Sequence, residues 1–500
     1  MIPLDAAGLI NSTQTQAIIA LVIIALAFFI GSITDLHMGV LVLSVLAIVG
    51  PVMYHDKIAV LQEGWNTNLM FTLIGVTYLF ALANNNGTVN WIVAMGMKAV
   101  AGKAQLFPFA MFAIVAVLTA IGCATPAACA IMMPIALAFA RQHGVNPIPM
   151  AQAVIQGCSA GSFSPMGIYG IIIKGSIDKN IGALNATGNA FNHMLMWSIA
   201  IIIDLLIVVV CFLLYRGNPG PSKAEVEAAG RDAKVDLDAS ADALNDEEFG
   251  DQSGEKAIDT EIKLNGERIA TLAGILLMAA VTITAAVVKF DVATTDADGA
   301  VTMVTTKLTS YVDISWTSLA IAAVLSLAFP KAAKGAIMQV AWPTILLVCG
   351  IVTYISMLEN HGVVQWIGGL AANAGSPVIT SIIIFFIAAL VSAYASTTGL
   401  FPILVPIALP FLGVVPEGVQ RPASLVSATM LMAGLGISAS TVDCSPFSTN
   451  GALGVANAAH QSEYTYKGLF KWSWILIVGT PIVCWALLML PPWGRLAAIS

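Results

Sequence analysis

The feature that most constrains this chain is a series of long apolar runs separated by short polar stretches. A helix needs about 20 mainly apolar residues to cross the hydrocarbon core of a bilayer. Ten such runs lie near residues 17–33, 38–54, 69–86, 151–175, 192–215, 268–289, 314–330, 337–358, 424–457 and 472–491. The chain is 58% hydrophobic and only 10% charged, whereas a soluble domain has about 25% charged residues. The sequence therefore predicts an all-α integral membrane protein of the inner (plasma) membrane.

Four regions depart from simple membrane spans. The runs 151–175 and 424–457 are interrupted by Gly, Ser and Pro, and the apolar regions 106–140 and 378–413 are broken in the middle. Each of the last two regions is typical of two half-helices around a polar tip, which is a re-entrant hairpin. Non-helical backbone at membrane depth is tolerated only where it lines a cavity or is buried in protein. Because paired breaks in two halves of a chain point to a transport site, these regions predict a secondary transporter.

The two halves of the chain also resemble each other in sequence. Matching residues recur at three similar offsets: Gly75, Gly87 and Trp91 match Gly350, Gly362 and Trp366 after 275 residues, the Pro-Ile-Ala-Leu sequence at Pro134 recurs at Pro406 after 272, and Ser164-Pro165 recurs at Ser445-Pro446 after 281. We therefore expect one repeat at 1–216 and a second at 267–500, each with five transmembrane helices and one re-entrant hairpin. An odd number of crossings inverts the second repeat in the membrane.

The segment 217–266 between the repeats has a different composition. It contains thirteen acidic and five basic residues, a net charge of −8 in a chain whose net charge is −7. Large apolar residues are too few there to offset the entropy of ordering the segment. We therefore expect a disordered acidic linker, with a regulatory docking segment as the alternative. The rest of the chain is close to neutral, so it offers no basic groove for nucleic acid.

The basic residues predict the orientation in the membrane. If the linker is cytoplasmic, fourteen of the 21 Lys and Arg residues fall on the cytoplasmic side, as the positive-inside rule requires. Both termini are then outside, the first hairpin opens to the cytoplasm and the second opens to the exterior. The seven cysteines lie in apolar stretches without CxxC spacing, which indicates small packing residues and no disulfide framework.

The polar tips and breaks supply the candidate site residues. Half-helix N-termini favour anions, because their N–H groups are unpaired and the positive end of the helix dipole lies there. We therefore predict substrate binding at the hairpin tips, which carry Thr125, Pro126, Ser396, Thr397 and Thr398. Hydroxyls and unwound carbonyls suit a hard cation such as Na⁺, so we predict cation binding at the interrupted spans, which carry Ser159, Gly161, Ser164, Ser440, Asp443 and Ser445.

Structural roles remain open for several of these residues. Ser and Thr often bond back to helix carbonyls, and small residues mediate packing between membrane helices. An acid inside a membrane span is costly unless it is paired, protonated or hydrated. Asp443 lies in a break, which favours a cation-linked role. Asp204 lies in an unbroken run, where a hydrogen bond between helices is the simpler explanation.

At these residues the chain resembles a known family. The tips followed by Pro-Ile-Ala-Leu, the Ser-Pro breaks and the sequence CSPFSTNGAL from Cys444 to Leu453 are similar to the divalent anion–sodium symporter family of the ion transporter superfamily, and in particular to its malonate/dicarboxylate carrier-like branch. The resemblance implies a homodimer with an elevator-type transport mechanism. It also implies an asparagine amide near the substrate; both tips lack one, and Asn450 on the neighbouring span can supply it.

The predicted function is secondary active transport of a small organic anion, a di- or monocarboxylate such as malonate or succinate. No cofactor is expected beyond Na⁺ or H⁺ as the coupling ion. The alternative is a Na⁺/H⁺ antiporter on the same scaffold, with Asp443 as the exchanging group. An enzyme is not expected, because the chain contains no HExxH sequence and its two intramembrane acids show no protease-like motif.

Overall fold

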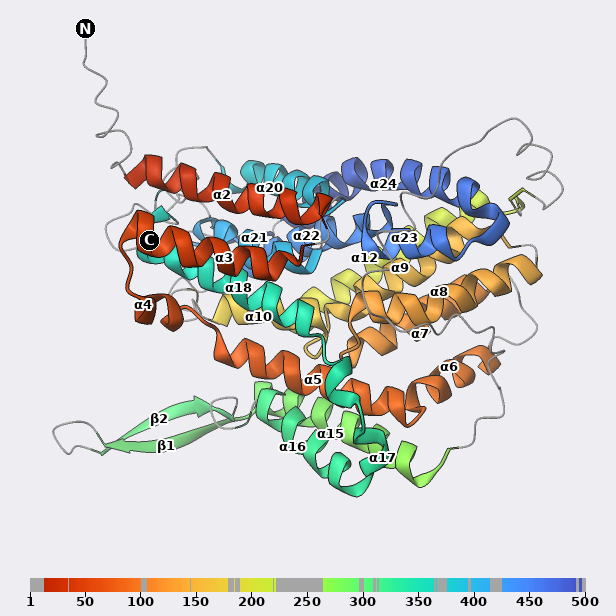
Figure 1. The fold of residues 1–500 in the computed structure, drawn as a ribbon, viewed down its shortest axis with the longest axis horizontal. Coiled ribbons are helices and arrows are strands. Elements are labelled where there is room, and N and C mark those ends of the chain that lie inside the picture. The colour runs from red at the N-terminus through yellow and green to blue at the C-terminus, as the bar shows by residue number, and fades with distance from the viewer. Residues whose placement is uncertain are drawn as a thin grey trace, which may run out of the picture.

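The computed structural model describes most of the chain and leaves several segments outside the description. The described residues are 13–34, 36–99, 106–143, 145–178, 184, 189–218, 220–221, 264–295, 301–308, 312, 314–363, 366, 376–393, 397–413, 425–491 and 494–496. Nearly all of the predicted linker 217–266 lies outside these residues, as does Ser396 of the second predicted tip. The described part is mainly helical (Figure 1).

The helices of the first half follow its apolar runs in order. They are α2 (Thr13–Ile33), α3 (Met38–Val49) with the π-helical turn η1 (Gly50–Tyr54), α4 (Ile58–Glu63), α5 (Thr67–Asn85), α6 (Thr88–Ala99), α7 (Phe107–Ala120), α8 (Thr125–Gln142), α9 (Pro147–Ser162), α10 (Ile168–Asp178) and α12 (His193–Tyr215).

The second half repeats this order and adds short turns. Its helices are α15 (Gly266–Val287), α16 (Ile314–Ala328), α17 (Pro330–Ala333), η5 (Ala336–Gln339), α18 (Trp342–Asn360), α20 (Pro377–Ser392), α21 (Thr397–Ala408), η6 (Leu409–Leu412), α22 (Ala428–Ser440), η7 (Thr441–Cys444), α23 (Thr449–Ala456), η8 (Ala459–Gln461), α24 (Ser462–Cys484) and η9 (Trp485–Met489).

Two short antiparallel strand pairs were not predicted, so the all-α expectation holds for the membrane helices alone. The strands β1 (Lys289–Thr295) and β2 (Val301–Lys307) form one ribbon, and β3 (Leu425–Val426) pairs with β4 (Arg495–Leu496). The first ribbon connects α15 to α16 and projects from the helical body (Figure 1). It forms because β-branched Val and Thr residues, which favour strands, flank the turn between 295 and 301.

The helical part fits an integral membrane protein. Four described helices are long and apolar enough to cross a membrane: Thr67–Asn85, His193–Tyr215, Trp342–Asn360 and Ala459–Met489. Most helices run roughly parallel to the long axis of the molecule (Figure 1). Large apolar side chains on their outer faces are well exposed, among them Ile202 at 65% and Leu327 at 82%. Such a surface is stable in lipid and costly in water.

Asparagine side chains begin several of these helices. Asn66 accepts a hydrogen bond from the N–H of Leu69 at the start of α5, and Asn192 accepts one from Leu195 at the start of α12. Asn146 caps α9 in the same way. A helix begins with N–H groups that have no partner in the helix, and Asn is among the best residues to satisfy one of them.

Two repeat-related glycines have the same backbone conformation. Gly87 and Gly362, which are 275 residues apart, have φ values of +76° and +75°. Each follows the end of a matching helix, and each accepts a hydrogen bond from the tryptophan four residues later, Trp91 or Trp366. Glycine adopts positive φ at little steric cost, so the sequence match corresponds to a match in local structure.

Glycines also bring α7 and α9 close together at the level of the first helix break. A Cβ on Gly157 would lie 2.7 Å from the carbonyl oxygen of Phe112, and a Cβ on Gly161 would lie 2.1 Å from that of Ala116. Small residues allow membrane helices to pack at such short separations. This contact holds the helix that ends at the first tip against the interrupted helix α9.

Candidate substrate and cation site

The two predicted hairpin tips meet at one buried cavity. Thr125 and Pro126 begin α8 on one side of it, and Thr397 and Thr398 begin α21 on the other. Thr125 and Thr397 are 272 residues apart, the same offset that relates the two Pro-Ile-Ala-Leu sequences. The tips are therefore matching parts of the two repeats, and both point a helix N-terminus at the same place.

The two interrupted helices complete the wall of the cavity. Tyr169 comes from the first turn of α10, while Asp443 comes from η7 and Ser448, Thr449 and Asn450 come from the start of α23. Tyr169 and Asn450 are 281 residues apart, which is the offset of the two Ser-Pro pairs. Four helix starts, two from each half of the chain, thus converge on one point.

Asp443 is the charged group of this cavity. Its Oδ1 accepts a hydrogen bond of 2.6 Å from the hydroxyl of Thr397, and its Oδ2 accepts one of 3.1 Å from the hydroxyl of Tyr169. Ser392 lies 2.6 Å from the Thr397 hydroxyl, so Ser392 donates to Thr397 while Thr397 donates to Asp443. The Asp443 side chain therefore connects the second tip to the interrupted helices of both halves.

Asn450 presents an amide with unused capacity. The residue is 4% exposed, and its Oδ1 has no hydrogen-bond partner among the described residues. Buried polar atoms are nearly always paired, so an unpaired amide oxygen in a cavity wall suits a ligand that accepts electron density, such as a cation or a proton donor. The position agrees with the predicted role of Asn450 near the substrate.

The cavity has a volume of about 30 Å³. By the usual measure a single water molecule needs about 10–15 Å³, so the cavity has room for about two water molecules and not for a dicarboxylate. Its wall contains hydroxyls, an amide and one carboxyl group; the described residues that line it include no Lys, Arg or His. In this state the site is closed around its own polar groups.

The six predicted cation-binding residues do not gather at this cavity, where only Asp443 belongs to the wall. Ser159 donates a hydrogen bond of 2.7 Å to Ser440. The hydroxyl of Ser445 accepts a hydrogen bond of 3.4 Å from the N–H of Phe447. These hydroxyls organise the helix breaks in this state, as the structural alternative for Ser and Thr anticipated.

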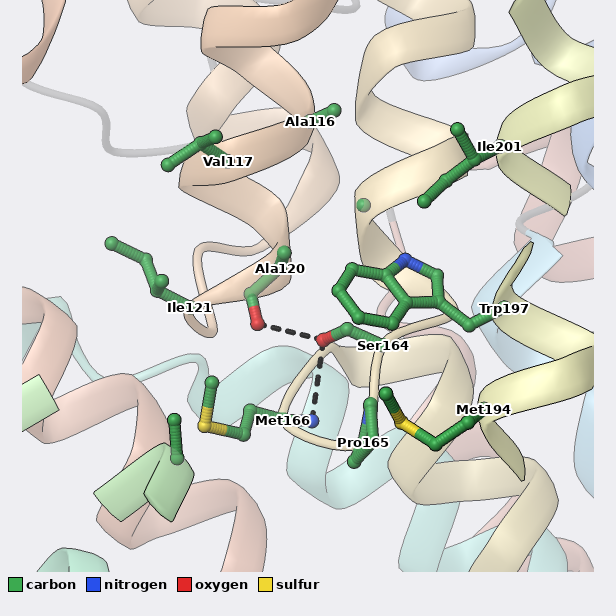
Figure 2. Close-up of a pocket in the computed structure, with 12 residues that line it drawn as sticks. Ala116, Val117, Ala120, Ile121, Ser164, Pro165, Met166, Met194, Trp197 and Ile201 are labelled. Carbon is green, nitrogen blue, oxygen red and sulfur yellow. Dashed lines mark hydrogen bonds between the residues drawn. The ribbon is translucent and has the colours of Figure 1, made fainter. Parts of the chain in front are cut away.

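The other two residues, Gly161 and Ser164, line a separate and larger cavity of about 340 Å³ (Figure 2). The Ser164 hydroxyl donates to the carbonyl oxygen of Ala120 at 2.6 Å and accepts from the N–H of Gly167 at 2.8 Å, so it is fully used. The rest of the wall is mainly apolar and includes Trp197 and Met194 (Figure 2). A carboxylate would lose its hydration there without gaining partners, so this cavity is not the anion site.

Three residues of the site were missed by the sequence analysis: Tyr169, Ser448 and Thr449. Tyr169 lies just beyond the interruption at 159–165, in a stretch that looks like an ordinary apolar helix. The repeat offset of 281 residues from Asn450 was the signal that would have identified it. Ser448 caps α23 by accepting a hydrogen bond from the N–H of Gly451, and a Ser-Thr-Asn sequence before a half-helix is a recognisable N-cap pattern.

The contact between Ser159 and Ser440 relates the two halves in space. These serines are 281 residues apart, the same offset as the Ser-Pro pairs that follow them. Two equivalent residues of a repeat touch each other directly only where an axis that exchanges the repeats passes close to both. Both serines are buried, so this point lies inside the protein.

Comparison with known protein families gave two matches. Residues 14–162 match the family model of the dicarboxylate carrier protein MatC N-terminus, and residues 300–499 match the family model of the citrate transporter. Both families belong to the divalent anion/sodium symporter type of ion transporter. The first match ends at the interrupted helix α9, and the second contains the second tip and α23. No curated protein matches the chain.

Proposed function

We propose that this chain, which belongs to the divalent anion/sodium symporter group of ion transporters, carries a small di- or monocarboxylate across the membrane together with Na⁺ or H⁺. The matched families are carriers of dicarboxylates and citrate, so the chain is a multi-pass membrane protein and a secondary transporter for organic anions. Carrier families imply a protein without enzymatic activity. The substrate, the coupling ion and the mechanism are the subject of the proposal.

The position of Asp443 supports coupling to a cation or a proton. A carboxylate substrate that occupies the cavity beside Asp443 brings two negative charges close together, and no basic side chain lines the described wall. Two unit charges about 4 Å apart interact with about 4 kcal/mol at an effective dielectric constant of about 20. A cation or a proton that binds with the substrate removes this repulsion, so the substrate and the coupling ion favour each other's binding.

The helix starts supply the groups that would hold the anion. α8 has no side chain that caps its N-terminus, and its N-cap residue Ala124 cannot provide one. Its first N–H groups are therefore available to a carboxylate, as a helix N-terminus favours. Thr125 and Thr398 add hydroxyl donors from the two tips, and Asn450 adds an amide. We assign the substrate to these groups and the coupling ion to Asp443.

The repeat-related contacts support an alternating-access mechanism based on inverted repeats. In this proposal α7–α8 and α20–α21 are re-entrant hairpins that enter from opposite sides, and their tips meet at the cavity. The closed cavity must widen before a dicarboxylate can bind, so the tips move apart in other states. By family resemblance this motion is an elevator-type displacement within a homodimer.

Uptake in proteoliposomes tests the proposed function. Labelled malonate, succinate and citrate should be tested one at a time with an inward Na⁺ gradient, with an inward proton gradient and with neither. We expect at least one carboxylate to accumulate under one of the two gradients, and unlabelled substrate to compete. Exchange of Na⁺ for H⁺ without any carboxylate, together with no carboxylate uptake, would instead support the antiporter and overturn the carrier proposal.

The proposed orientation makes a separate prediction. α4, which follows Lys57, and the β1–β2 ribbon, which begins and ends with Lys289 and Lys307, lie toward one end of the long axis, while α6 extends to the other end (Figure 1). A cysteine introduced at Ser240 should be unreactive toward an impermeant thiol reagent in intact cells, and one at Thr305 should react. All seven native cysteines are buried, so background labelling is low. Labelling at position 240 from outside would contradict the inverted-repeat topology.

A further inference from the structure

Asp204 is a buried acid without a partner. It lies in the middle of α12, on the buried face that also carries Ala200, Ile203 and Val208. The residue is 0% exposed, and neither of its carboxyl oxygens has a hydrogen-bond partner among the described residues. The hydrogen bond between helices that the sequence suggested for Asp204 is therefore not formed in this state. Such an exception to the pairing of buried polar groups calls for an explanation.

The groups around Asp204 come from three other helices. Ser159 of α9 is close enough to act on the carboxyl group, although no hydrogen bond joins them. Cys484 of α24 faces Asp204 and is the titratable neighbour on that helix. Ser438 of α22 lies beside Cys484, and its hydroxyl also has no partner within the described residues. The acid is thus surrounded by hydroxyl and thiol groups.

Charged side chains on the packed helices are engaged elsewhere. α7, α9 and α22 contain no charged residue. On α10, Lys174 pairs with Asp178, and on α24, Lys467 pairs with Glu463 in the first turns, whereas Cys484 ends the helix. Lys471 follows one helical repeat after Glu463 and Lys467, far from that end. The carboxyl of Asp443 on η7 is already bonded to Thr397 and Tyr169.

This environment favours the neutral acid. A carboxylate that is buried without a cation or hydrogen-bond donors is strongly disfavoured, and a buried acid takes up a proton instead. Neither cavity described above reaches Asp204, so these cavities provide no space for a hydrated metal ion beside it. A proton needs no additional space. Asp204 in this state is therefore the protonated form of a group that can titrate.

A short chain of contacts joins Asp204 to the substrate cavity. Ser159, next to Asp204, donates a hydrogen bond of 2.7 Å to Ser440. Ser440 ends α22 and directly precedes η7, the turn that carries Asp443 into the cavity wall. A change in the charge of Asp204 reorients Ser159 and so acts on the start of η7. The contact between the repeats thus lies between the buried acid and the site.

On the basis of the proposed transport function, we propose that Asp204 is a proton-binding site that couples proton movement to carboxylate transport. In the closed state the carboxyl group holds a proton. When the interrupted helices move and water reaches the group, the O–H bond breaks, the proton leaves to water, and the hydrated carboxylate remains until it takes a proton from the other side. The substrate and the proton move in the same direction.

The decisive comparison uses proteoliposomes with wild-type protein, Asp204→Asn and the matched control Asp178→Asn. Asp178 is an exposed acid that pairs with Lys174, so its substitution makes the same chemical change away from the core. With the membrane potential clamped, a gradient of one pH unit drives about tenfold accumulation per coupled proton. We expect wild type and Asp178→Asn to show this accumulation of labelled malonate or succinate, whichever exchanges faster, and Asp204→Asn to lose it.

Exchange of labelled for unlabelled carboxylate at equal pH separates the two proposals. This exchange needs the carrier and no proton gradient, so we expect it to survive in Asp204→Asn. No exchange by wild type would refute the proposed function. Exchange with undiminished proton-driven accumulation in Asp204→Asn, or with no proton-driven accumulation in wild type, would refute only the role of Asp204.

Two further measurements keep the test decisive if the asparagine variant does not fold. Asp204→Glu retains the titratable group, and we expect it to retain proton-driven accumulation. A hydrophobic carbodiimide, which reacts with protonated buried carboxyl groups, should modify Asp204 in the wild type and block proton-driven accumulation. Mass spectrometry that finds no modification of Asp204 at any pH would overturn the proposal.

Discussion

Replacing Asp443 with asparagine is expected to weaken binding of the coupling ion by about three orders of magnitude and to abolish ion-driven uptake. The side chain of asparagine has nearly the same shape, and its oxygen can still accept the hydrogen bond of 2.6 Å from Thr397. What is lost is the negative charge. At about 4 Å and an effective dielectric constant of about 20, a unit charge contributes about 4 kcal/mol to the binding of a monovalent cation. Asparagine also cannot take up a proton, so the effect holds for either coupling ion.

The measurement is the initial rate of carboxylate uptake as a function of Na⁺ concentration and of pH. Asp178→Asn is again the matched control, because it removes an exposed acid on α10, the same helix that carries Tyr169. We expect the control to keep the wild-type dependence on both ions. An Asp443→Asn protein with unchanged dependence on Na⁺ and pH would show that Asp443 only holds the second tip in place.

The helix breaks could be predicted from the sequence because their causes are local. Gly, Ser and Pro within an apolar run disrupt helix geometry wherever the run folds, and the structure breaks the helices at these points. α9 ends at Ser162, and η7 ends at Cys444 before the Ser-Pro pair. The matching offsets of the two halves also predicted which breaks correspond. Local chemistry and repetition therefore carried the prediction of where irregular backbone occurs.

The partners across the site could not be predicted in the same way. Tyr169 donates to Asp443 over a separation of 274 residues, and this contact depends on how α10 and η7 are rotated and packed. Ser159 and Ser440 were both predicted as cation ligands, but in this state they bond to each other. The residue types predict polar pairing, whereas tertiary packing decides which hydroxyl meets which partner.

The β1–β2 ribbon was missed although its signal was present. Phe290, Val292, Val301 and Val304 alternate with polar residues on either side of an Asp-Gly sequence at 298–299, a recognised hairpin pattern. The region was read only as a connection between two apolar runs. Search for long spans gives weight to hydropathy over about 20 residues, and alternation over seven residues does not register on that scale.

Removing one hydroxyl from either tip is expected to raise the apparent KM for the carboxylate substantially. Thr125 and Thr398 face the same cavity from α8 and α21. A hydrogen bond to a charged ligand contributes about 1.5–3 kcal/mol, which corresponds to a change of roughly 10- to 150-fold in affinity. We therefore expect Thr125→Ala and Thr398→Ala each to raise the apparent KM by about this factor. The measurement is uptake rate against substrate concentration at saturating coupling ion.

Thr397 provides an internal comparison, because its hydroxyl is bonded to Asp443. Thr397→Ala should therefore alter the dependence on Na⁺ or pH, whereas Thr125→Ala and Thr398→Ala should leave that dependence near wild type. Thr353→Ala is the matched control: its buried hydroxyl bonds only to the carbonyl of Cys349 within α18 among the described contacts, so its KM should not change. If Thr125→Ala and Thr398→Ala leave the KM unchanged while transport persists, the anion does not bind between the two helix starts. If instead all three tip variants change only the ion dependence, the cavity is an ion site and the carboxylate must bind elsewhere.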